Sequence, residues 1–349
     1  MFLQNEFIFL LINNQLKNDR KMIDLSTKYM GLTLKNPIII GSSGLTNSVE
    51  KIVEIEKNGA AAVVLKSLFE EQIKHEINKT ISQNDNQFAY PEALDYIKNY
   101  SEEHSFESYL NLIRESKKAV KIPIIASINC VTSSEWIAYA KKIQDAGADA
   151  LELNIFLLPS DVNNSSEQNE KVYFDIISEV KKQVTIPIAV KTSFYFSGLA
   201  KMMLKLSWTG ISGLVFFNRF FSPDIDIDNF TITNTNVYSH PEEISTSLRW
   251  VAILSDKLYC DVAASTGIHD GRAVIKQLLA GAKATQIASV LYKNGFEYIG
   301  VMLKEIEEWM QKNNYKNIEE FRGKMSYKKT GNTPAYLRVQ FMKYFAGIE

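Results

Sequence analysis

Cysteine is scarce in this chain, and neither sign of charge is in excess. Only two cysteines occur, Cys130 and Cys260, each within an apolar run and far from any metal-ligand spacing. We therefore expect neither a disulfide framework nor an iron–sulfur cluster, and we expect the reducing cytoplasm as the compartment. The 39 Lys and Arg residues almost balance the 40 Asp and Glu residues, so no overall field attracts nucleic acid or an anionic membrane. A small-molecule substrate is the expected partner.

Long hydrophobic runs and clustered histidines are also missing. The apolar run at residues 7–12 is too short to span a bilayer, no basic segment precedes it, and no small-residue cleavage site follows it. We predict that residues 1–21 are an N-terminal extension, disordered or read from an upstream start codon, and that the folded domain opens at Met22. His104, His240 and His269 are isolated from other ligand residues, so no metal site is predicted.

From Met22 onward, short runs rich in β-branched residues alternate with amphipathic stretches of helical period. Several of the runs follow a glycine and small residues, as in "NGAAAVVLKS" and "AGADALELNI", which is typical of a helix that ends at glycine and leads into a strand. Eight runs predict a (β/α)8 TIM barrel over residues 22–326, with an open sheet as the alternative. The runs are 37–40, 61–66, 122–129, 150–155, 186–193, 213–218, 259–266 and 284–289.

Two stretches interrupt this alternation, and a tail follows it. Residues 68–106 insert a polar segment after the second predicted strand, and residues 219–238 insert an alternating, hairpin-like segment after the sixth. Such insertions are usually functional loops, and in a barrel both would lie at the C-terminal face, where active sites are found. Residues 327–349 form a tail that we expect to pack on the barrel or on a partner.

Polar and small residues follow the predicted strands and would meet at one mouth of the barrel. Lys66 and Lys191 stand within otherwise apolar strands, which favours an anion or an electron-rich ring as their neighbour, although a lysine at a strand end can also reach solvent. The small-residue turns after the last two strands occur where barrel enzymes bind phosphate, although such turns can also bind nothing. The set is Ser42, Ser43, Gly44, Lys66, Ser67, Asn129, Asn154, Lys191, Asn218, Thr266, Gly267, Ala288 and Ser289.

A family resemblance rests on motifs in a fixed order. "NPIIIGSSG", "VVLKS", "LELN", "VKTS", "LVFFN", "STGI" and "ATQIASVLYKNG" resemble the dihydroorotate dehydrogenases of the soluble, FMN-containing class. The resemblance implies FMN as cofactor and the oxidation of dihydroorotate to orotate in pyrimidine biosynthesis. We also expect a homodimer, with a separate electron-transfer subunit as a further partner.

The resemblance implies a role for each residue at the mouth. Ser42, Ser43 and Gly44 would lie along the isoalloxazine edge, and Ser67 and Asn129 would add cofactor contacts. Lys191 would lie near flavin N1 and O2, where its charge favours hydride acceptance. The FMN phosphate would bind at Thr266, Gly267, Ala288 and Ser289, and the catalytic residues at the substrate would be Lys66, Asn154 and Asn218.

The expected catalytic base is missing. The family places a cysteine or serine in the loop after the fourth strand, whereas this chain reads "NIFLLP", with Leu157 at the base position. Leu157 cannot accept a proton, so a base would come from Ser160, Asp161, His75, Tyr195 or Lys66. Three alternatives therefore stay open: a flavin oxidoreductase with a more apolar substrate, suited by Phe156, Leu157, Phe217, Phe220 and Phe221; a non-catalytic flavin- or phosphate-binding barrel; and a flavin-free lyase with a Schiff-base lysine.

Overall fold

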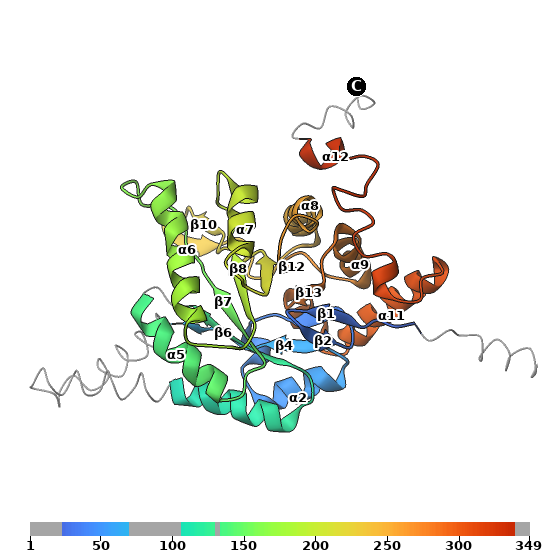
Figure 1. Ribbon diagram of the computed structural model, residues 1–349, viewed down its shortest axis with the longest axis horizontal. Helices are drawn as coiled ribbons and strands as arrows, with labels where there is room; N and C mark the ends of the chain where they lie inside the picture. Colours follow the sequence, from blue (N-terminus) through green and yellow to red (C-terminus); the bar gives the residue numbers. More distant parts are fainter. Residues whose placement is uncertain (1–22, 70–105, 130–132, 339–349) are drawn as a thin grey trace, which may run out of the picture.

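The structure is a computed structural model that describes residues 23–69, 106–129 and 133–338 (Figure 1). The predicted extension 1–21, most of the insertion after the second strand, and the end of the tail lie outside the described residues. Cys130 and His75 also lie outside them. The boundaries that we predict for the extension and the tail therefore stay predictions.

Parallel strands close into a barrel at the centre of the molecule. Each strand pairs in parallel with the next, and the pairing of Gln286 with Ile39 joins the last strand to the first. A short strand, β5 (Leu68–Phe69), extends the pairing along one neighbour. The (β/α)8 prediction is confirmed and the open sheet is excluded. The barrel strands are β3 (Ile38–Ile40), β4 (Ala62–Val64), β6 (Ile124–Asn129), β7 (Ala150–Asn154), β8 (Ile188–Thr192), β9 (Gly213–Phe216), β12 (Asp261–Ser265) and β13 (Ala284–Ile287).

Helices surround the barrel (Figure 1). In α11, Ile299, Ile306 and Met310 are fully buried, as the helical period predicts. The glycines at the predicted helix ends have positive φ, 102° at Gly59 and 99° at Gly147, which glycine adopts without strain. The helices are α2 (Val49–Lys57), residues 106–119, α5 (Ser133–Asp145), α6 (Ser166–Lys181), α7 (Leu199–Ser207), α8 (Ile244–Leu254), α9 (Gly271–Ala280), α10 (Ser289–Asn294), α11 (Tyr298–Lys312) and α12 (Pro334–Leu337), with 3-10 turns η1 (Gly44–Thr46), η2 (Pro241–Glu243) and η3 (Ile318–Glu320).

An N-terminal hairpin closes the bottom of the barrel. Strands β1 (Thr27–Tyr29) and β2 (Leu32–Leu34) pair antiparallel and place Tyr29 and Met30 against the lowest inward-facing side chains. Those side chains are small, so the two large residues fit between them. The Met30 N–H donates to Asp261 Oδ2 at 2.8 Å. The small residues are Ala62, Ala150, Ala189, Gly213, Ala263 and Ala284.

A second hairpin rises from the opposite, C-terminal end of the barrel. Strands β10 (Pro223–Asp226) and β11 (Thr231–Asn234) pair antiparallel within the predicted insertion 219–238. Ile225 lies opposite Ile232 on one face of the hairpin, and both side chains are exposed. The hairpin-like prediction is therefore right, and the segment adds a projection beside the mouth of the barrel.

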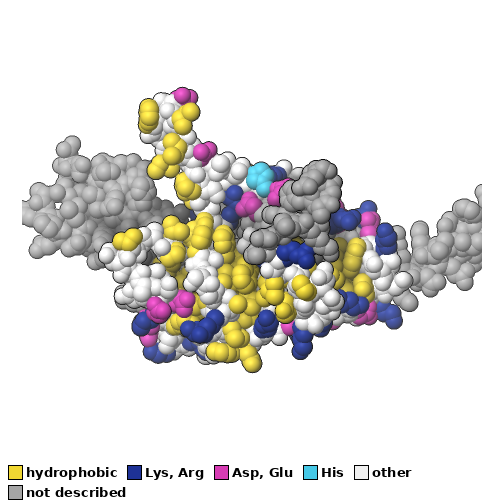
Figure 2. Space-filling view, turned by 90° about the horizontal axis from the view of Figure 1, so that it is seen from above, with side chains coloured by type: hydrophobic (Ala, Val, Ile, Leu, Met, Phe, Trp, Pro, Cys, Tyr) yellow, Lys and Arg dark blue, Asp and Glu magenta, His cyan; other side chains and the backbone are white. Residues whose placement is uncertain are grey.

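The described residues also show the state of one cysteine, the character of the helices and the distribution of charge on one face. Cys260 is a free, partly buried thiol, and burial raises its pKa to about 12. Among the helices of the described ranges, none combines the length and the apolar character that crossing a membrane requires. On the face shown in Figure 2, basic and acidic side chains are interspersed rather than separated into patches of one sign.

Candidate functional site

A cavity of about 200 Å³ opens at the C-terminal ends of the strands. It brings together seven of the residues predicted from the sequence, which come from both ends of the chain. Asn218 and Thr266 belong to the loops after β9 and β12, and Lys191 belongs to β8. The predicted residues in its lining are Ser42, Lys191, Asn218, Thr266, Gly267, Ala288 and Ser289, and they are joined by Gly41, Arg219, Ser239, Ser265, Ile268, Gln286 and Ile287. We call it the strand-end cavity.

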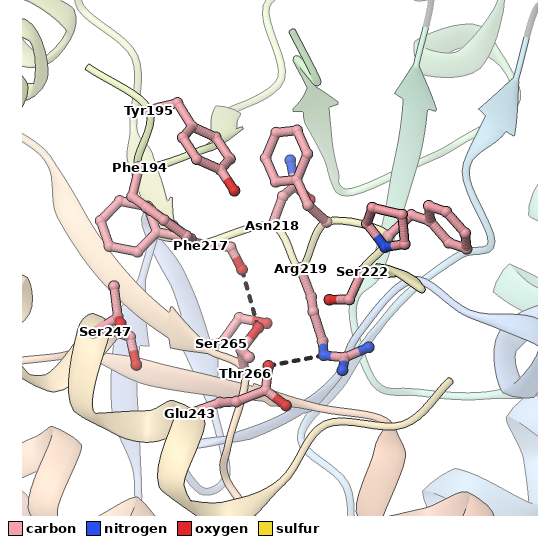
Figure 3. A pocket seen from close by; sticks show the side chains of 14 residues that line it. Phe194, Tyr195, Phe217, Asn218, Arg219, Ser222, Glu243, Ser247, Ser265 and Thr266 are labelled. Carbon is pink, nitrogen blue, oxygen red and sulfur yellow. Dashed lines mark hydrogen bonds and ion pairs between the residues drawn. The ribbon is translucent and has the colours of Figure 1, made fainter. Parts of the chain in front are cut away.

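A larger cavity of about 430 Å³ adjoins it (Figure 3). The two cavities share Asn218, Arg219, Ser265 and Thr266. Aromatic side chains form much of the wall, and the Tyr195 side chain points into the space (Figure 3). We call it the aromatic cavity; its aromatic residues are Phe194, Tyr195, Phe217, Phe220 and Phe221.

A tight turn after β12 separates the strand-end cavity from helix α8. Thr266 has φ of 72° and Gly267 has φ of 74°. A Cβ atom on Gly267 would lie 2.1 Å from the Ile244 backbone nitrogen, so only glycine fits at this position. The Thr266 hydroxyl donates to the Phe217 carbonyl at 3.3 Å, which ties the turn to the loop after β9.

Lys191 supplies a buried positive charge at the base of the strand-end cavity. Its Nζ donates to Gln286 Oε1 at 2.9 Å and lies 3.9 Å from Glu152 Oε1. Asn154 lies beside Lys191 in the register of β7 and β8, and the buried Asn154 Oδ1 has no hydrogen-bond partner within the described ranges. Asn154 is in the lining of neither cavity, and a buried acceptor without a partner is energetically costly.

Other predicted residues lie outside the linings of the two cavities. Ser67 contacts the strand-end cavity indirectly, because its Oγ is 3.0 Å from Ser42 Oγ. Ser43 caps η1, where its Oγ accepts from the Leu45 N–H, and the Gly44 carbonyl accepts from Lys51 Nζ. Lys66 follows β4 and Asn129 ends β6, and both are half-buried.

Sequence reasoning missed polar side chains at this site, among them Glu152 and Gln286, and it did not predict the ion pair of Arg219. Glu152 and Gln286 lie inside the barrel and bond to each other, and Arg219 donates through Nε to Glu243 Oε2 at 2.8 Å. The signal for the first two is their inward parity: Glu152 stands two residues before Asn154, and Gln286 stands two before Ala288. Nothing in the sequence indicates that Arg219 pairs with Glu243.

The structure narrows the search for a proton-transfer group. Asp161 is exposed, and its Oδ1 accepts from the Asn163 N–H at 2.9 Å; Ser160 is also exposed. Leu157 packs partly buried against the core. Of the candidates that the structure describes, Tyr195 is the one in the lining of the aromatic cavity.

Comparisons of the sequence with known proteins identify its family. The family model described as "Dihydroorotate dehydrogenase" matches residues 24–310. Dihydroorotate dehydrogenase B (NAD(+)), catalytic subunit, of Thermoplasma volcanium is 26% identical over 324 residues, which cover 86% of this chain and 98% of that protein. The protein of the same name from Pyrococcus horikoshii is 27% identical, with 86% and 97% covered. Dihydroorotate dehydrogenase A (fumarate) of Lactococcus lactis is 25% identical, with 63% and 75% covered.

Proposed function

Because this chain belongs to the dihydroorotate dehydrogenase family, we propose that it is an FMN-dependent oxidoreductase that acts on a CH–CH bond and converts dihydroorotate to orotate. The observation that carries the proposal is the strand-end cavity, where a buried lysine and two small-residue turns converge. The unpartnered Asn154 Oδ1 beside Lys191 supports a bound planar, hydrogen-bonding ligand such as a flavin ring.

FMN would accept a hydride from the substrate, and different residues of the strand-end cavity would bind its phosphate and its ring. Thr266, Gly267, Ala288 and Ser289 would hold the phosphate, because small residues let backbone N–H groups approach its oxygens. Lys191 would place its charge at the pyrimidine end of the flavin ring. Ser42 would contact the ring edge, held by Ser67 through the bond between their hydroxyls.

Substrate binding and proton transfer would take place toward the aromatic cavity. Asn218 lines both cavities, and its Nδ2 donates to the Lys191 carbonyl at 3.4 Å, which would orient its amide for a contact with the substrate. Lys66 and Asn154 would complete the substrate contacts from β4 and β7. We assign the proton transfer to the Tyr195 hydroxyl, because that side chain points into the aromatic cavity (Figure 3) while Leu157 offers no acidic or basic atom.

A second candidate, a flavin oxidoreductase with a more apolar substrate, is favoured by the aromatic wall. Phe156 stacks on Phe220 with ring centroids 4.1 Å apart, and Tyr195 packs edge-on against Phe220 at 4.8 Å. Arg219, which lines the aromatic cavity, is paired with Glu243 and also donates to the Asn236 carbonyl. Such a wall binds flat apolar groups better than a carboxylate.

The names of the relatives suggest which partner proteins this chain acts with. The archaeal relatives are named catalytic subunits of an NAD(+)-linked enzyme, and we propose that this chain likewise acts with a separate electron-transfer subunit. Homodimer formation and a cytoplasmic location are further proposals, and the tail beyond Ser326 is a candidate contact segment. Its described part begins on the barrel, where the Tyr327 N–H donates to the Ala252 carbonyl at 2.7 Å.

One experiment tests the flavin, the substrate and Tyr195 together. Purified protein should show flavin absorbance, and anaerobic dihydroorotate should bleach it. In Tyr195→Phe the flavin should stay bound, while bleaching should slow by about 100-fold or more, since a positioned proton-transfer group contributes on that order. Tyr238→Phe, a change of the same chemistry outside the aromatic lining, is the control.

The outcomes separate the candidates. Protein without flavin absorbance contradicts the proposed cofactor. Flavin that dihydroorotate leaves coloured, but that a neutral aromatic hydride donor bleaches, selects the second candidate. Equal bleaching rates in Tyr195→Phe and the parent remove Tyr195 from the mechanism and leave the cofactor assignment intact.

A further inference from the structure

A carboxylate is buried in the interior of the barrel, at a level where such barrels usually hold aliphatic side chains. Alternation along the strands turns Glu152 of β7 and Gln286 of β13 inward, at the level of Val64 and Val215. Glu152 is 1% exposed and Gln286 is 2% exposed. Burying a carboxylate costs several kcal/mol unless it is paired and hydrogen-bonded, so this pair needs an explanation beyond packing.

Hydrogen bonds connect this pair directly to Lys191. Gln286 Nε2 donates to Glu152 Oε2 at 2.5 Å, and Gln286 Oε1 accepts from Lys191 Nζ at 2.9 Å. The second carboxylate oxygen, Glu152 Oε1, lies 3.9 Å from the same Nζ. The three groups, which we call the interior relay, therefore run from the buried carboxylate to the strand-end cavity, which Gln286 and Lys191 both line.

The order of the groups fixes the direction of the Gln286 amide. An ionised carboxylate only accepts hydrogen bonds and an ammonium only donates them. With Glu152 on one side, the NH₂ group of Gln286 faces Glu152 and the carbonyl oxygen faces Lys191. Without the carboxylate the amide could turn and present its NH₂ group to the Lys191 ammonium, which would displace the lysine from its position.

From this geometry we infer that Glu152 and Gln286 are positioning residues that hold Lys191 Nζ at the flavin, and that the Glu152 carboxylate sets the reduction potential of the flavin by offsetting the Lys191 charge. The inference rests on the proposed FMN function. A positive charge beside the flavin favours its reduced form, and a buried negative charge 3.9 Å from that lysine opposes the effect.

The test is the midpoint potential of the bound flavin in Glu152→Gln, which keeps the shape of the side chain and removes its charge. The equilibrium between reduced and oxidised flavin should move about tenfold or more toward the reduced form, which for a two-electron couple is a rise of ~30 mV. Glu152→Asp, which keeps the charge, should remain closer to the parent. If Glu152 served packing alone, the midpoint potential would not depend on whether the side chain at this position carries a charge.

A second variant tests the positioning separately. Gln286→Met removes both amide contacts at similar volume, and the dissociation constant of FMN should rise about tenfold, as expected when one charge-assisted contact is lost. Gln277→Met is the matched control, because Gln277 is equally buried and its Nε2 donates to Ser247 Oγ, outside the interior relay.

The electrostatic role and the positioning role can each be overturned by a separate result. An unchanged potential in a yellow, folded Glu152→Gln overturns the electrostatic role, and an FMN affinity in Gln286→Met equal to that of Gln277→Met overturns the positioning role. If neither relay variant melts cooperatively while Gln277→Met does, the pair serves the fold and the inference is wrong. A parent protein without flavin refutes the proposed function instead, so the two failures are distinguishable.

Discussion

At the scale of single residues, the turn Thr266–Gly267 shows how tightly the site is built. Thr266 is a β-branched residue with φ of 72°. The left-handed region costs a residue with a Cβ roughly 1–2 kcal/mol, and the Thr266 bond to the Phe217 carbonyl offsets part of that cost. Gly267 cannot be replaced without moving its neighbours, because the backbone of Ile244 occupies the space where a Cβ atom would lie.

Replacing Gly267 by alanine should therefore damage the strand-end cavity. The new Cβ would meet the Ile244 nitrogen at 2.1 Å and the Glu243 carbonyl carbon at 2.7 Å, so η2 and α8 would have to move. We expect a loss of about 1–3 kcal/mol in the free energy of unfolding and weaker FMN binding, measured by denaturant titration and flavin fluorescence. Gly300→Ala is the control, since its Cβ would meet no atom within 4 Å; equal stability of the two variants would contradict the expectation.

At the scale of elements, Arg219 joins the second hairpin to η2. Its Nε donates to Glu243 Oε2, and its Nη1 donates to the carbonyls of Asn236 and Val237, where the chain leaves the hairpin. The Arg219–Glu243 ion pair, drawn as a dashed line in Figure 3, thereby connects the loop after β9 to η2 beside the aromatic cavity. The ion pair and the two bonds to backbone carbonyls therefore connect these elements through one side chain.

That ion pair predicts a dependence of stability on pH. Partial burial by itself would raise the pKa of Glu243, but hydrogen bonds from Arg219 and the His240 N–H outweigh it and hold the pKa below the ordinary 4.5. The carboxylate therefore stabilises the fold above pH 4.5, and this contribution disappears as the pH falls through the lower folded-state value. Glu243→Gln should melt below the parent at pH 7 and converge with it in acid. A difference in melting temperature that is constant with pH would show that the pair contributes nothing through its charge.

At the scale of the whole molecule, two buried tyrosines differ in their hydrogen bonding: Tyr29 lies at the closed bottom of the barrel and Tyr109 lies against its wall. The Tyr29 hydroxyl is buried without a hydrogen-bond partner among the described residues. The Tyr109 hydroxyl donates to the Ser127 carbonyl at 3.0 Å and accepts from the Ser127 N–H at 2.8 Å, which fixes the helix at residues 106–119 to β6. Both residues lie in hydrophobic clusters. Replacement by phenylalanine therefore removes a hydroxyl without a partner in one case and a hydroxyl with two partners in the other.

Tyr29→Phe should leave the protein as stable as the parent or about 1 kcal/mol more stable, because it removes an unpartnered buried hydroxyl. Tyr109→Phe should lower the free energy of unfolding by about 1–3 kcal/mol, because it leaves both backbone groups of Ser127 without this partner. Each variant serves as the control for the other in urea unfolding. A larger loss in Tyr29→Phe than in Tyr109→Phe would reverse the interpretation.

Periodicity and turn chemistry were sufficient to predict the architecture. Apolar runs of strand length, amphipathic helices and glycines such as Gly59 and Gly147 predicted the barrel strands and their order, because these signals are local in the chain. The seven predicted residues around the strand-end cavity follow from the same order, since parallel strands deliver their C-terminal ends to one face.

Only the tertiary structure decided which side chains meet inside the barrel. Glu152 and Gln286 are 134 residues apart, and closure of the barrel brings them into contact. Arg219 meets Glu243 because the hairpin between them folds back. The sequence by itself therefore determined the family, the barrel, the mouth and several aromatic residues near it, while the interior relay, the enclosure of the aromatic cavity and the pairing of Arg219 follow from packing among distant segments, which no local pattern encodes.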